Sequence, residues 1–513
     1  MGMFFGSIKI KSIWKSTFCG TLLIGILTHM FAMTNTLLTY DSIYNVYSSQ
    51  NMISSGRQFL KFACGISSYY NLPWINGLLS IVWISVAAVL LVEVFRIEES
   101  TIAILLGGII VSFPSVSANF AYMFAVDGYM LAFLLAVAAF FVTDRRKFGF
   151  APGIVFMGVS IGIYQAYFSV TVILAICVLL ILLLTEDDFK KILNKGVRYL
   201  IMGVGGYAFY VVTLKIMLFF QKDASLSGYQ GTNLVMGNPF ANLGRGVIKA
   251  YQQFFIFLLR QNVITANVFM TVAVWAIILF GIGAYVYLFF QKKRNNVIRI
   301  VCAVVLVLLM PIGATIVDVL SPDTYFHILM RLPWAILLVF AVVVGKMFLT
   351  EAARNQRKIR IRGCAELLQT IIAGVLVFCF MVSANIVYFN LNERYEKTYA
   401  VCSLLVDRLY NTEGYETGMP VAVVGGLPPQ SVFPSTDITG NTVLKDYFGC
   451  QGDYVVSSTF GIKVFCEHYL GVTIEESECA YSEEWADELE EMELFPYAGS
   501  IKQIDGIWVV KFG

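Results

Sequence analysis

Two aspartates that adjoin long apolar stretches are the candidates for acid–base chemistry in this sequence. Asp41 follows the apolar stretch 17–38, and Asp127 opens the apolar stretch 127–143. An ionisable residue at membrane depth is costly, so it is a functional hypothesis by default. A carboxylate in such a position could act as a general base on a hydroxyl group. The alternative for each is a helix N-cap, a position that Asp favours.

Two pairs of cationic side chains have a spacing of four residues. Arg57 and Lys61 form the first pair, and His327 and Arg331 form the second. Residues four apart share one face of a helix, and such a pair is suited to bind a phosphate at a membrane surface. The alternative is that their stems cover apolar surface while the charges reach lipid headgroups.

The remaining ionisable residues and motifs give weaker indications. We expect Asp318 and Asp323 to be ordinary carboxylates at the rim of the membrane, and His29 to be a hydrogen-bonded packing residue. The sequence contains no GxxxxGK[ST], HExxH or CxxC motif, so nothing points to ATP hydrolysis or a zinc site. The basic residues fall mainly in loops of one predicted side, which gives no support for nucleic-acid binding.

Membrane helices must position these residues. Hydrophobic residues make up 58% of the 513 residues and charged residues only 14%, whereas a soluble domain carries about 25% charge. A helix needs roughly 20 apolar residues to cross a bilayer. Eleven stretches meet this requirement: 17–38, 76–95, 101–117, 127–143, 150–164, 168–184, 199–219, 264–290, 297–317, 331–349 and 367–388.

The loops between these stretches predict an orientation. With the N-terminus in the cytoplasm, inner loops hold 21 Lys and Arg residues and outer loops hold seven, as the positive-inside rule requires. The outer loops are then 40–75, 221–262 and 321–331. Helical spacing of apolar residues in 40–75 predicts a helix lying flat at the interface. The loop 221–262 is predicted to be mobile at first and then to form a second interfacial helix.

A change in composition near residue 390 predicts two domains. Residues 390–513 contain 7 basic and 20 acidic residues, a balance of −13, and residues 1–389 carry the remaining +15. We therefore expect a polytopic α-helical domain over 1–389 and a small extracytoplasmic α/β domain over 390–513. The latter pattern contains a helix at 393–411, a strand in MPVAVVGG, an acidic helix at 482–492, and a terminal hairpin with an Asp-Gly turn.

Several short motifs, taken together, resemble one enzyme family. An acid ends the first span, GRQF (56–59) lies in the next loop, and a Pro-Trp leads into the second span. An Asp opens the fourth span, YQAY (164–167) separates two further spans, and the chain ends in a GSI…DG…VV hairpin. Together these motifs resemble the type-II O-antigen glucosyltransferases (Gtr) of phages and bacteria, within the GT-C class. The family commonly has paired acids after the first span, whereas TYDS offers Asp41 alone.

The resemblance implies a membrane glycosyltransferase of the bacterial cytoplasmic (inner) membrane. It would move a hexose, with glucose expected, from an undecaprenyl-type polyprenyl-phosphate carrier to a hydroxyl of a cell-surface polysaccharide or lipid-linked glycan outside. Asp41 is then expected to be the general base, with Asp127 assisting. Arg57, His327 and Arg331 are expected to hold the phosphate, and Lys61 is a weaker candidate. Membrane lipids are the other expected partners. No cofactor or metal is required, although some members of the class use a divalent metal.

Two other classes remain as alternatives. An envelope polysaccharide polymerase or ligase also has many spans and a large outer loop, but would typically carry paired arginines there; 221–262 has only Arg245 and Arg260. A lipid-linked sugar flippase or secondary transporter is the more distant alternative, because the span count is odd and no internal repeat is evident. Sugar transfer from a labelled polyprenyl-phosphate donor would separate the enzymes from a transporter.

Overall fold

The computed structural model divides the chain into two compact units, each described here by itself. It describes residues 11–221, 226, 242–293, 296–323, 325, 327–354, 359–428, 430–435, 444, 453–477 and 485–513. The first unit comprises the residues up to Met33 together with Ser49–Asn385, and the second comprises Thr34–Ser48 and Ile386–Gly513. The predicted boundary at 389/390 lies close to the observed one. The inclusion of Thr34–Ser48 in the second unit was not expected.

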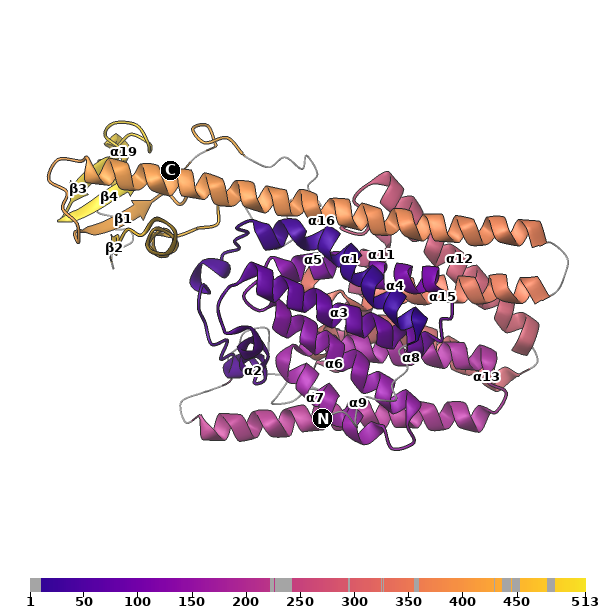
Figure 1. Cartoon of the computed structure of the whole chain (residues 1–513). Helices are drawn as coiled ribbons and strands as arrows, with labels where there is room; N and C mark the ends of the chain where they lie inside the picture. The colour runs from indigo at the N-terminus through magenta and orange to yellow at the C-terminus, as the bar shows by residue number, and fades with distance from the viewer. Residues whose placement is uncertain are drawn as a thin grey trace, which may run out of the picture. The chain divides into compact units, whose positions relative to one another are not determined.

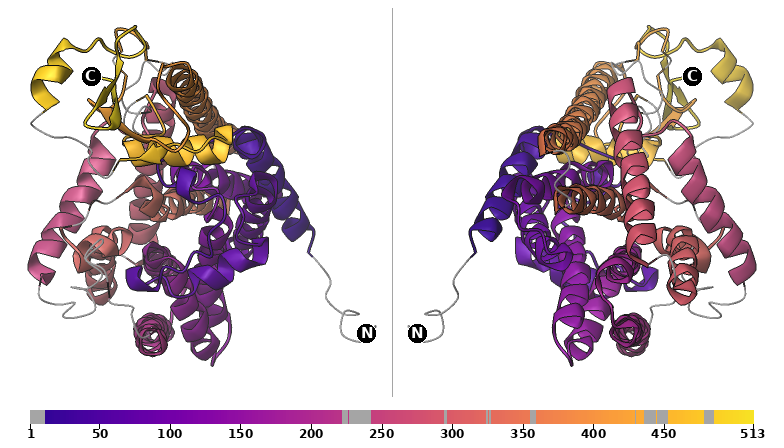
Figure 2. Two further views of the ribbon diagram at one scale, coloured as in Figure 1. Left: turned by 90° about the vertical axis from the view of Figure 1, so that its left-hand side faces the viewer. Right: turned by 90° about the vertical axis from the view of Figure 1, so that its right-hand side faces the viewer.

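The first unit is a bundle of long apolar helices (Figure 1; seen end-on in Figure 2). Its longer helices are α1 (Ser12–Thr34), α3 (Pro73–Phe95), α4 (Ser100–Ser112), α6 (Val126–Arg145), α7 (Phe150–Ile163), α8 (Phe168–Thr185), α9 (Phe189–Phe220), α11 (Leu243–Leu259), α12 (Val268–Lys293), α13 (Val297–Ala314), α15 (Pro333–Arg354) and the first part of α16 (Ile359–Tyr410). Its short elements are η2 (Ile53–Ser55), α2 (Leu60–Cys64), η3 (Gly65–Ser67), α5 (Pro114–Phe120), η4 (Gln165–Tyr167), α14 (Ile316–Leu320) and η6 (Ile328–Met330).

The helices support a polytopic membrane protein. Among the described residues, nine helices are long and apolar enough to cross a membrane. The pair α4 and α5, bent by 47° at Phe113, would make a tenth; Pro114 at the first position of α5 starts a new helix, as proline favours. Each of the eleven predicted stretches overlaps a helix, but α7 has only 14 residues. The count of eleven spans therefore stays a prediction.

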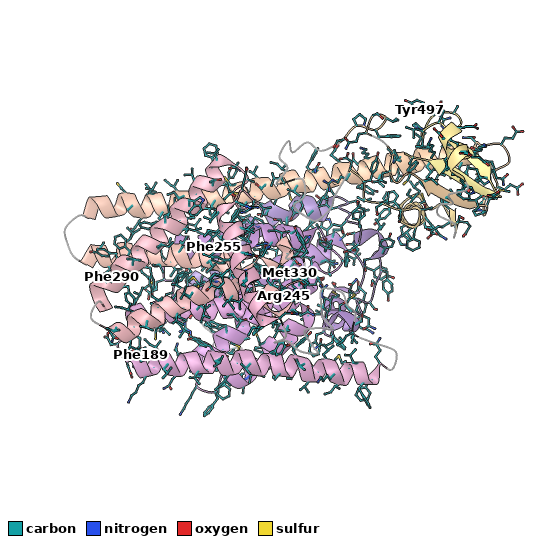
Figure 3. The ribbon with its side chains drawn as sticks, turned by 180° about the vertical axis from the view of Figure 1, so that it is seen from behind. Phe189, Arg245, Phe255, Phe290, Met330 and Tyr497 are labelled. Atoms are coloured by element: carbon teal, nitrogen blue, oxygen red, sulfur yellow. The ribbon has the colours of Figure 1, made fainter. Side chains whose placement is uncertain are left out.

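Charged contacts gather at one end of the first unit. Glu93 at the end of α3 pairs with Lys11 at 2.6 Å and with Arg145 of α6 at 3.5 Å. Asp144 pairs with Lys195 of α9. Phe189 and Phe290 lie at one end of the helices, and Met330 of η6 lies nearer the other (Figure 3). Loops that were predicted to share the inner side are therefore joined to one another in the structure.

The loop 40–75, predicted to lie on the outer side, does not contain the predicted flat helix. The chain forms η1 (Ser42–Tyr44), η2, the five-residue α2 and η3 instead. Gly56 adopts a left-handed conformation (φ 71°) and an isolated bridge joins Met52 to Arg57. Left-handed backbone at Gly56 suits a turn or a helix end. The bridge between Met52 and Arg57 is likewise not part of a helix. The helical spacing of apolar residues was thus a misleading signal in this loop.

The second unit is built on a four-stranded sheet of order β2-β1-β4-β3. Its strands are β1 (Pro420–Val424), β2 (Glu475–Glu476), β3 (Ile501–Ile504) and β4 (Ile507–Lys511), and its short helices are η1, α18 (Thr459–Phe465), η7 (Cys466–Leu470) and α19 (Ala486–Glu491). Strand β1 runs parallel to β2 and β4, and β3 and β4 form an antiparallel hairpin. Asp505 and Gly506 take positive φ values of 49° and 80°, so the predicted Asp-Gly turn is confirmed. Residues 482–484 of the predicted acidic helix lie outside the described residues.

A hydrophobic core explains why Thr34–Ser48 belongs to the second unit. Leu38 and Ile43 are buried in the same cluster as residues of α16, β1, α18 and β4, among them Val401, Leu405, Leu409, Val421, Phe465 and Trp508. Helix α16 is continuous from Ile359 to Tyr410, so the predicted division into a span at 367–388 and a separate helix at 393–411 is wrong. The intervening FNLN (389–392) contains no Pro or Gly to end the helix.

Candidate functional site

The first charged group of the site is Arg57, which lies on aromatic rings. Its Nη1 donates to the Tyr129 hydroxyl at 3.2 Å. Its guanidinium carbon lies 5.2 Å from the centre of the Tyr164 ring and 6.0 Å from that of Tyr129. The face of an aromatic ring attracts a guanidinium group. Arg57 is therefore held against aromatic rings at the start of α6 and the end of α7.

Hydrogen bonds and one close approach fix the GRQF segment that carries Arg57. The Phe59 amide donates to the Gly162 carbonyl at 2.8 Å. A Cβ atom at Gly162 would lie 2.4 Å from the Phe59 ring, so only glycine allows this approach. The Gln58 amide group donates to the Tyr210 carbonyl and to the Thr213 hydroxyl, each at 3.2 Å. The segment is thus attached to α7 and α9.

The two segments GRQF and YQAY, distant in sequence, meet here. Gln165 of η4 donates from Nε2 to the Ser55 carbonyl at 2.9 Å, one residue before Gly56. Tyr164 packs between Tyr129 and Tyr167, with ring centres 4.5 Å and 5.2 Å apart. The polar interruption at YQAY therefore does more than separate α7 from α8. It supplies the aromatic ring beneath Arg57.

Asp127 lies in the first turn of α6 and is only 1% exposed. A carboxylate in a first turn is favoured by the helix dipole. Ser67 and the Gly128 amide are its polar neighbours, yet neither carboxylate oxygen accepts a hydrogen bond of standard geometry among the described residues. A Cβ atom at Gly128 would lie 3.0 Å from the Cys64 sulfur, so α2 packs closely over this turn. Asp127 is therefore a buried acid two residues from the Tyr129 ring that contacts Arg57.

The second charged group joins α11 and α14. Lys249 Nζ lies 3.3 Å from Asp318 Oδ1 and donates to the Pro322 carbonyl at 2.5 Å. The Asp318 side chain is fully buried. Burial raises the pKa of Asp318 from its ordinary 3.8 to about 6, and the charges of Lys249 and Arg331 oppose this rise. The expectation that Asp318 is a rim carboxylate is wrong.

Arg331 follows η6 and completes the second group. Its Nη2 donates to Gln253 Oε1 of α11 at 2.9 Å, and its guanidinium carbon lies 4.6 Å from the centre of the Phe257 ring. Burial lowers the pKa of Arg331 to about 10, so it stays charged near neutral pH. Burial and the Arg331 charge lower the pKa of His327 to about 4. At neutral pH, His327 can therefore offer a hydrogen bond but not a positive charge.

Contacts between short elements connect the surroundings of the two groups. Helix α14, which carries Asp318, contacts η4, whose first residue follows Tyr164. The turn η6, which precedes Arg331, contacts α5. The two groups together hold three positive charges, those of Arg57, Lys249 and Arg331, and two acids, Asp127 and Asp318. We refer to these five residues together as the charged site.

The predicted pairing of cations is only partly correct in geometry. Arg57 precedes α2, whereas Lys61 is an exposed residue within α2. The two residues therefore do not share one helix face, and that prediction is wrong. His327 and Arg331 flank the single turn η6, as its N-cap and C-cap, and the Arg331 charge acts on His327.

The predicted acids lie in different surroundings. Asp41 belongs to the second unit, where it is exposed. It is the N-cap residue of η1 but makes no side-chain cap hydrogen bond. The pairing of Asp41 with Asp127 therefore stays a prediction. Asp323 is exposed and lies 3.4 Å from Arg245, as expected for a rim carboxylate. Asp223, an acid of the predicted outer loop 221–262, lies outside the described residues.

Sequence reasoning missed Lys249, Gln253 and the burial of Asp318. Lys249 and Gln253 are four residues apart on α11, where the predicted amphipathic helix does form. Lys249 is itself part of the charged site, and Gln253 accepts a hydrogen bond from Arg331. The signal for Asp318 was its apolar neighbours Val317 and Val319. Within the described ranges, no group of three His, Cys, Asp or Glu side chains could hold a metal ion.

The fold and the charged site define a polytopic membrane protein with buried ionic groups among its helix ends. The family model described as Glucosyl transferase GtrII matches residues 30–340, more than half of the chain. The chain therefore belongs to the GtrII glucosyltransferase family, and the resemblance drawn from the short motifs is confirmed. The matched range contains Asp41 and all five residues of the charged site. No curated protein and no solved structure matches the chain at a significant level.

Proposed function

We propose that this glucosyltransferase is of the GT-C type and takes glucose from a polyprenyl-phosphate carrier. The acceptor is a hydroxyl of a cell-surface polysaccharide or lipid-linked glycan, on the outer face of the bacterial cytoplasmic membrane. The observation that carries the proposal is the charged site, in which Arg57 and Arg331 are held on aromatic rings beside membrane-length helices. A soluble sugar nucleotide would not need a cationic site beside membrane helices. A lipid-linked phosphate, in contrast, must be bound at membrane depth.

The chemistry needs cations more than a second acid. Attack of the acceptor oxygen on the anomeric carbon forms the new glycosidic bond and breaks the bond to the phosphate oxygen. The acceptor proton passes to a general base, and the polyprenyl phosphate leaves as a monoester. The phosphate charge thus grows from one towards two negative charges. Cations placed around it stabilise the transition state more than the bound donor.

Arg57 and Arg331 are the proposed phosphate ligands. A guanidinium group offers several N–H donors in one plane and forms strong, charge-assisted bonds with phosphate oxygens. Lys249 contributes a further charge, which Asp318 partly balances. His327, uncharged near neutral pH, is proposed as a hydrogen-bond donor only. Lys61 is exposed on α2 and is a weaker candidate, close in sequence to the site.

An apolar surface for the isoprenoid chain lies on the elements that follow Arg57 in the chain. Phe62 of α2 and Ile66 of η3 are 61% and 58% exposed, and Trp74 at the start of α3 is 58% exposed. Large apolar side chains that remain exposed in a membrane protein face lipid or a lipid-like ligand. We propose that the polyprenyl chain lies along these residues while its phosphate meets Arg57.

Asp41 keeps the role of general base, and Asp127 that of a supporting acid. A base must reach the hydroxyl of a bulky glycan, and Asp41 is exposed. Asp127 is buried, so it is placed to orient the start of α6 and Tyr129 rather than to meet an acceptor. No metal is needed for this scheme.

The choice of donor tests the proposal. The purified full chain in lipid vesicles would be given glucose-labelled undecaprenyl phosphate or labelled UDP-glucose, with envelope polysaccharide from host cells lacking the protein. We expect transfer from the lipid-linked donor alone. Transfer from UDP-glucose without the lipid donor would contradict the proposal. Orientation is tested separately with Tyr497→Cys, because Tyr497 is 58% exposed: a membrane-impermeant maleimide should label it in intact cells or spheroplasts.

A further inference from the structure

The second unit presents an exposed aromatic pair beside Asp41. Tyr44 of η1 and Phe460 of α18 stack with ring centres 5.7 Å apart and planes only 12° from parallel. The two residues are 42% and 49% exposed. Phe465, Phe495 and Trp508 of this unit are buried in its core, whereas this nearly parallel pair stays exposed on a fixed base and is a candidate binding surface.

Both rings are held in place by the fold beneath them. Ile43 points into the hydrophobic core, and its carbonyl contacts His468 Nδ1 of η7 at 3.0 Å. The preceding residue, Ser42, shares a hydrogen bond with Thr39 at 2.9 Å. With Ile43 fixed inward, its neighbour Tyr44 is directed outward. The turn η1 therefore presents Tyr44, and three residues earlier Asp41, on a rigid base.

The start of α18 fixes Phe460 in the same way. Ser458 caps the helix by accepting a hydrogen bond from the Gly461 amide at 3.1 Å. The Val423 amide of β1 donates to the Thr459 hydroxyl at 3.2 Å. Phe460 is thus held between a cap and the sheet. A preorganised ring loses little conformational freedom when it binds a ligand.

The charges around the pair are acidic. Burial raises the pKa of the Tyr44 hydroxyl, and the negative charges of Glu476 of β2 and of Asp41 raise it further. Glu475, beside Glu476, pairs with Lys463 at 3.5 Å. Carboxylates accept hydrogen bonds from hydroxyl groups, whereas they repel anionic lipid headgroups, which basic residues attract. A neutral, hydroxyl-rich ligand fits this surface better than a membrane does.

We propose that Tyr44 and Phe460, flanked by Asp41 and Glu476, bind a pyranose ring of the acceptor glycan. The apolar face of the sugar packs on the exposed surface of the stacked pair, and its hydroxyls donate hydrogen bonds to the carboxylates. The surface then holds the acceptor next to Asp41, the proposed base. This inference rests on the proposed function for the identity of the ligand, but binding at this surface is measurable without any transfer.

The test uses the full chain in nanodiscs and envelope polysaccharide from host cells that lack the protein. Tyr44→Ala and Phe460→Ala are each expected to weaken polysaccharide binding roughly tenfold, the size of one lost aromatic contact. Tyr44→Phe keeps the ring and should bind within about twofold of the wild type. Tyr497→Ala removes another exposed aromatic ring of the same unit and should bind like the wild type.

Kinetics give a second, separate readout. The Ala variants should raise KM for the polysaccharide roughly tenfold and leave KM for the lipid-linked donor unchanged. Wild-type binding by both Ala variants would overturn the inference, and so would an equal loss in Tyr497→Ala. If either Ala variant melts below the wild type, the other and Tyr44→Phe decide the question. If the wild type binds polysaccharide but transfers no glucose from the lipid donor, the proposed function fails while this surface stands.

Discussion

Asp318 offers a quantitative test of the charged site through pH and stability. Its side chain is fully buried beside Lys249, and burial raises its pKa from 3.8 to about 6. A carboxylic acid whose pKa is raised on folding favours the folded state in its protonated form. Its contribution to stability is therefore fully present below pH 3.8 and is lost as the pH rises through 6. At neutral pH the ionised Asp318 destabilises the first unit.

The size of this effect follows from the shift. A rise of about 2 pKa units corresponds to about 3 kcal/mol once the pH exceeds 6. The substitution Asp318→Asn removes the titrating group with little change in shape. The free energy of unfolding of the variant, relative to that of the wild type, should rise by about 2 to 3 kcal/mol between pH 4 and pH 8. The absolute effect at pH 4 includes the cost of burying the new amide, about 1–3 kcal/mol, and this cost is the same at both pH values.

Removing one partner of a buried ion pair often destabilises a protein by about 3–5 kcal/mol, so the two effects must be weighed. That cost arises when the remaining charge is buried without compensation. Lys249 is 22% exposed and donates to the Pro322 carbonyl, and Arg331 retains Gln253 and the Phe257 ring. We therefore expect the pH-dependent gain to be visible.

The assay is thermal or denaturant unfolding of the full chain in detergent at pH 4, 5, 6, 7 and 8. Asp323→Asn is the matched control, because Asp323 is exposed and pairs only loosely with Arg245. Its effect should be constant with pH. A difference between Asp318→Asn and the wild type that does not change from pH 4 to pH 8 would refute the burial of a titrating carboxylate at this site.

Three further predictions concern the residues that position and bind the phosphate. Arg57→Gln should lower transfer about 100-fold or more, as expected when one donor to a developing charge is lost, whereas Lys61→Gln should lower it less than tenfold; equal losses in initial-rate assays would point to a general surface charge effect. Arg331→Ala should raise KM for the lipid-linked donor far more than Asp323→Ala. Comparable KM values in the two variants would indicate that Arg331 has only a structural role at the rim of the membrane. Gly162→Val should displace the GRQF segment, because even a Cβ atom would lie 2.4 Å from the Phe59 ring; a transfer rate and a melting temperature equal to those of the wild type would show that this contact is unimportant.

Periodicity and hydropathy predicted the parts of the fold that depend on local physics. Each predicted span overlaps a helix because a long apolar stretch has few other stable conformations in a membrane. The Asp505-Gly506 turn was predictable because positive φ values at both central residues suit this pair of residue types. The sequence around Phe254 and Phe257, predicted to form an interfacial helix, forms α11 as its spacing indicates.

The failures came where tertiary packing decides the outcome. Helical spacing in 40–75 predicted one helix, but Leu38 and Ile43 are buried in the core of the second unit, while Phe59 packs against Gly162 of the first. A segment of about 20 residues whose two ends pack into different hydrophobic cores cannot remain one helix. Asp318 was assigned to the rim because its sequence position is close to a helix end, and only the packing of α14 on α11 shows its burial. Asp41, Arg57 and Asp127 were found as candidates because charges are scarce in this region of the sequence.

The central claim is that a carboxylate base and a lipid-linked phosphate donor together carry out glucosyl transfer. The most direct measurement is the initial rate of transfer from glucose-labelled undecaprenyl phosphate to envelope polysaccharide, compared between the wild type and Asp41→Asn. We predict that Asp41→Asn lowers the rate by about 100-fold to 10,000-fold, the usual contribution of a general base, with unchanged melting temperature and donor binding. A near-normal rate in this variant would contradict the account.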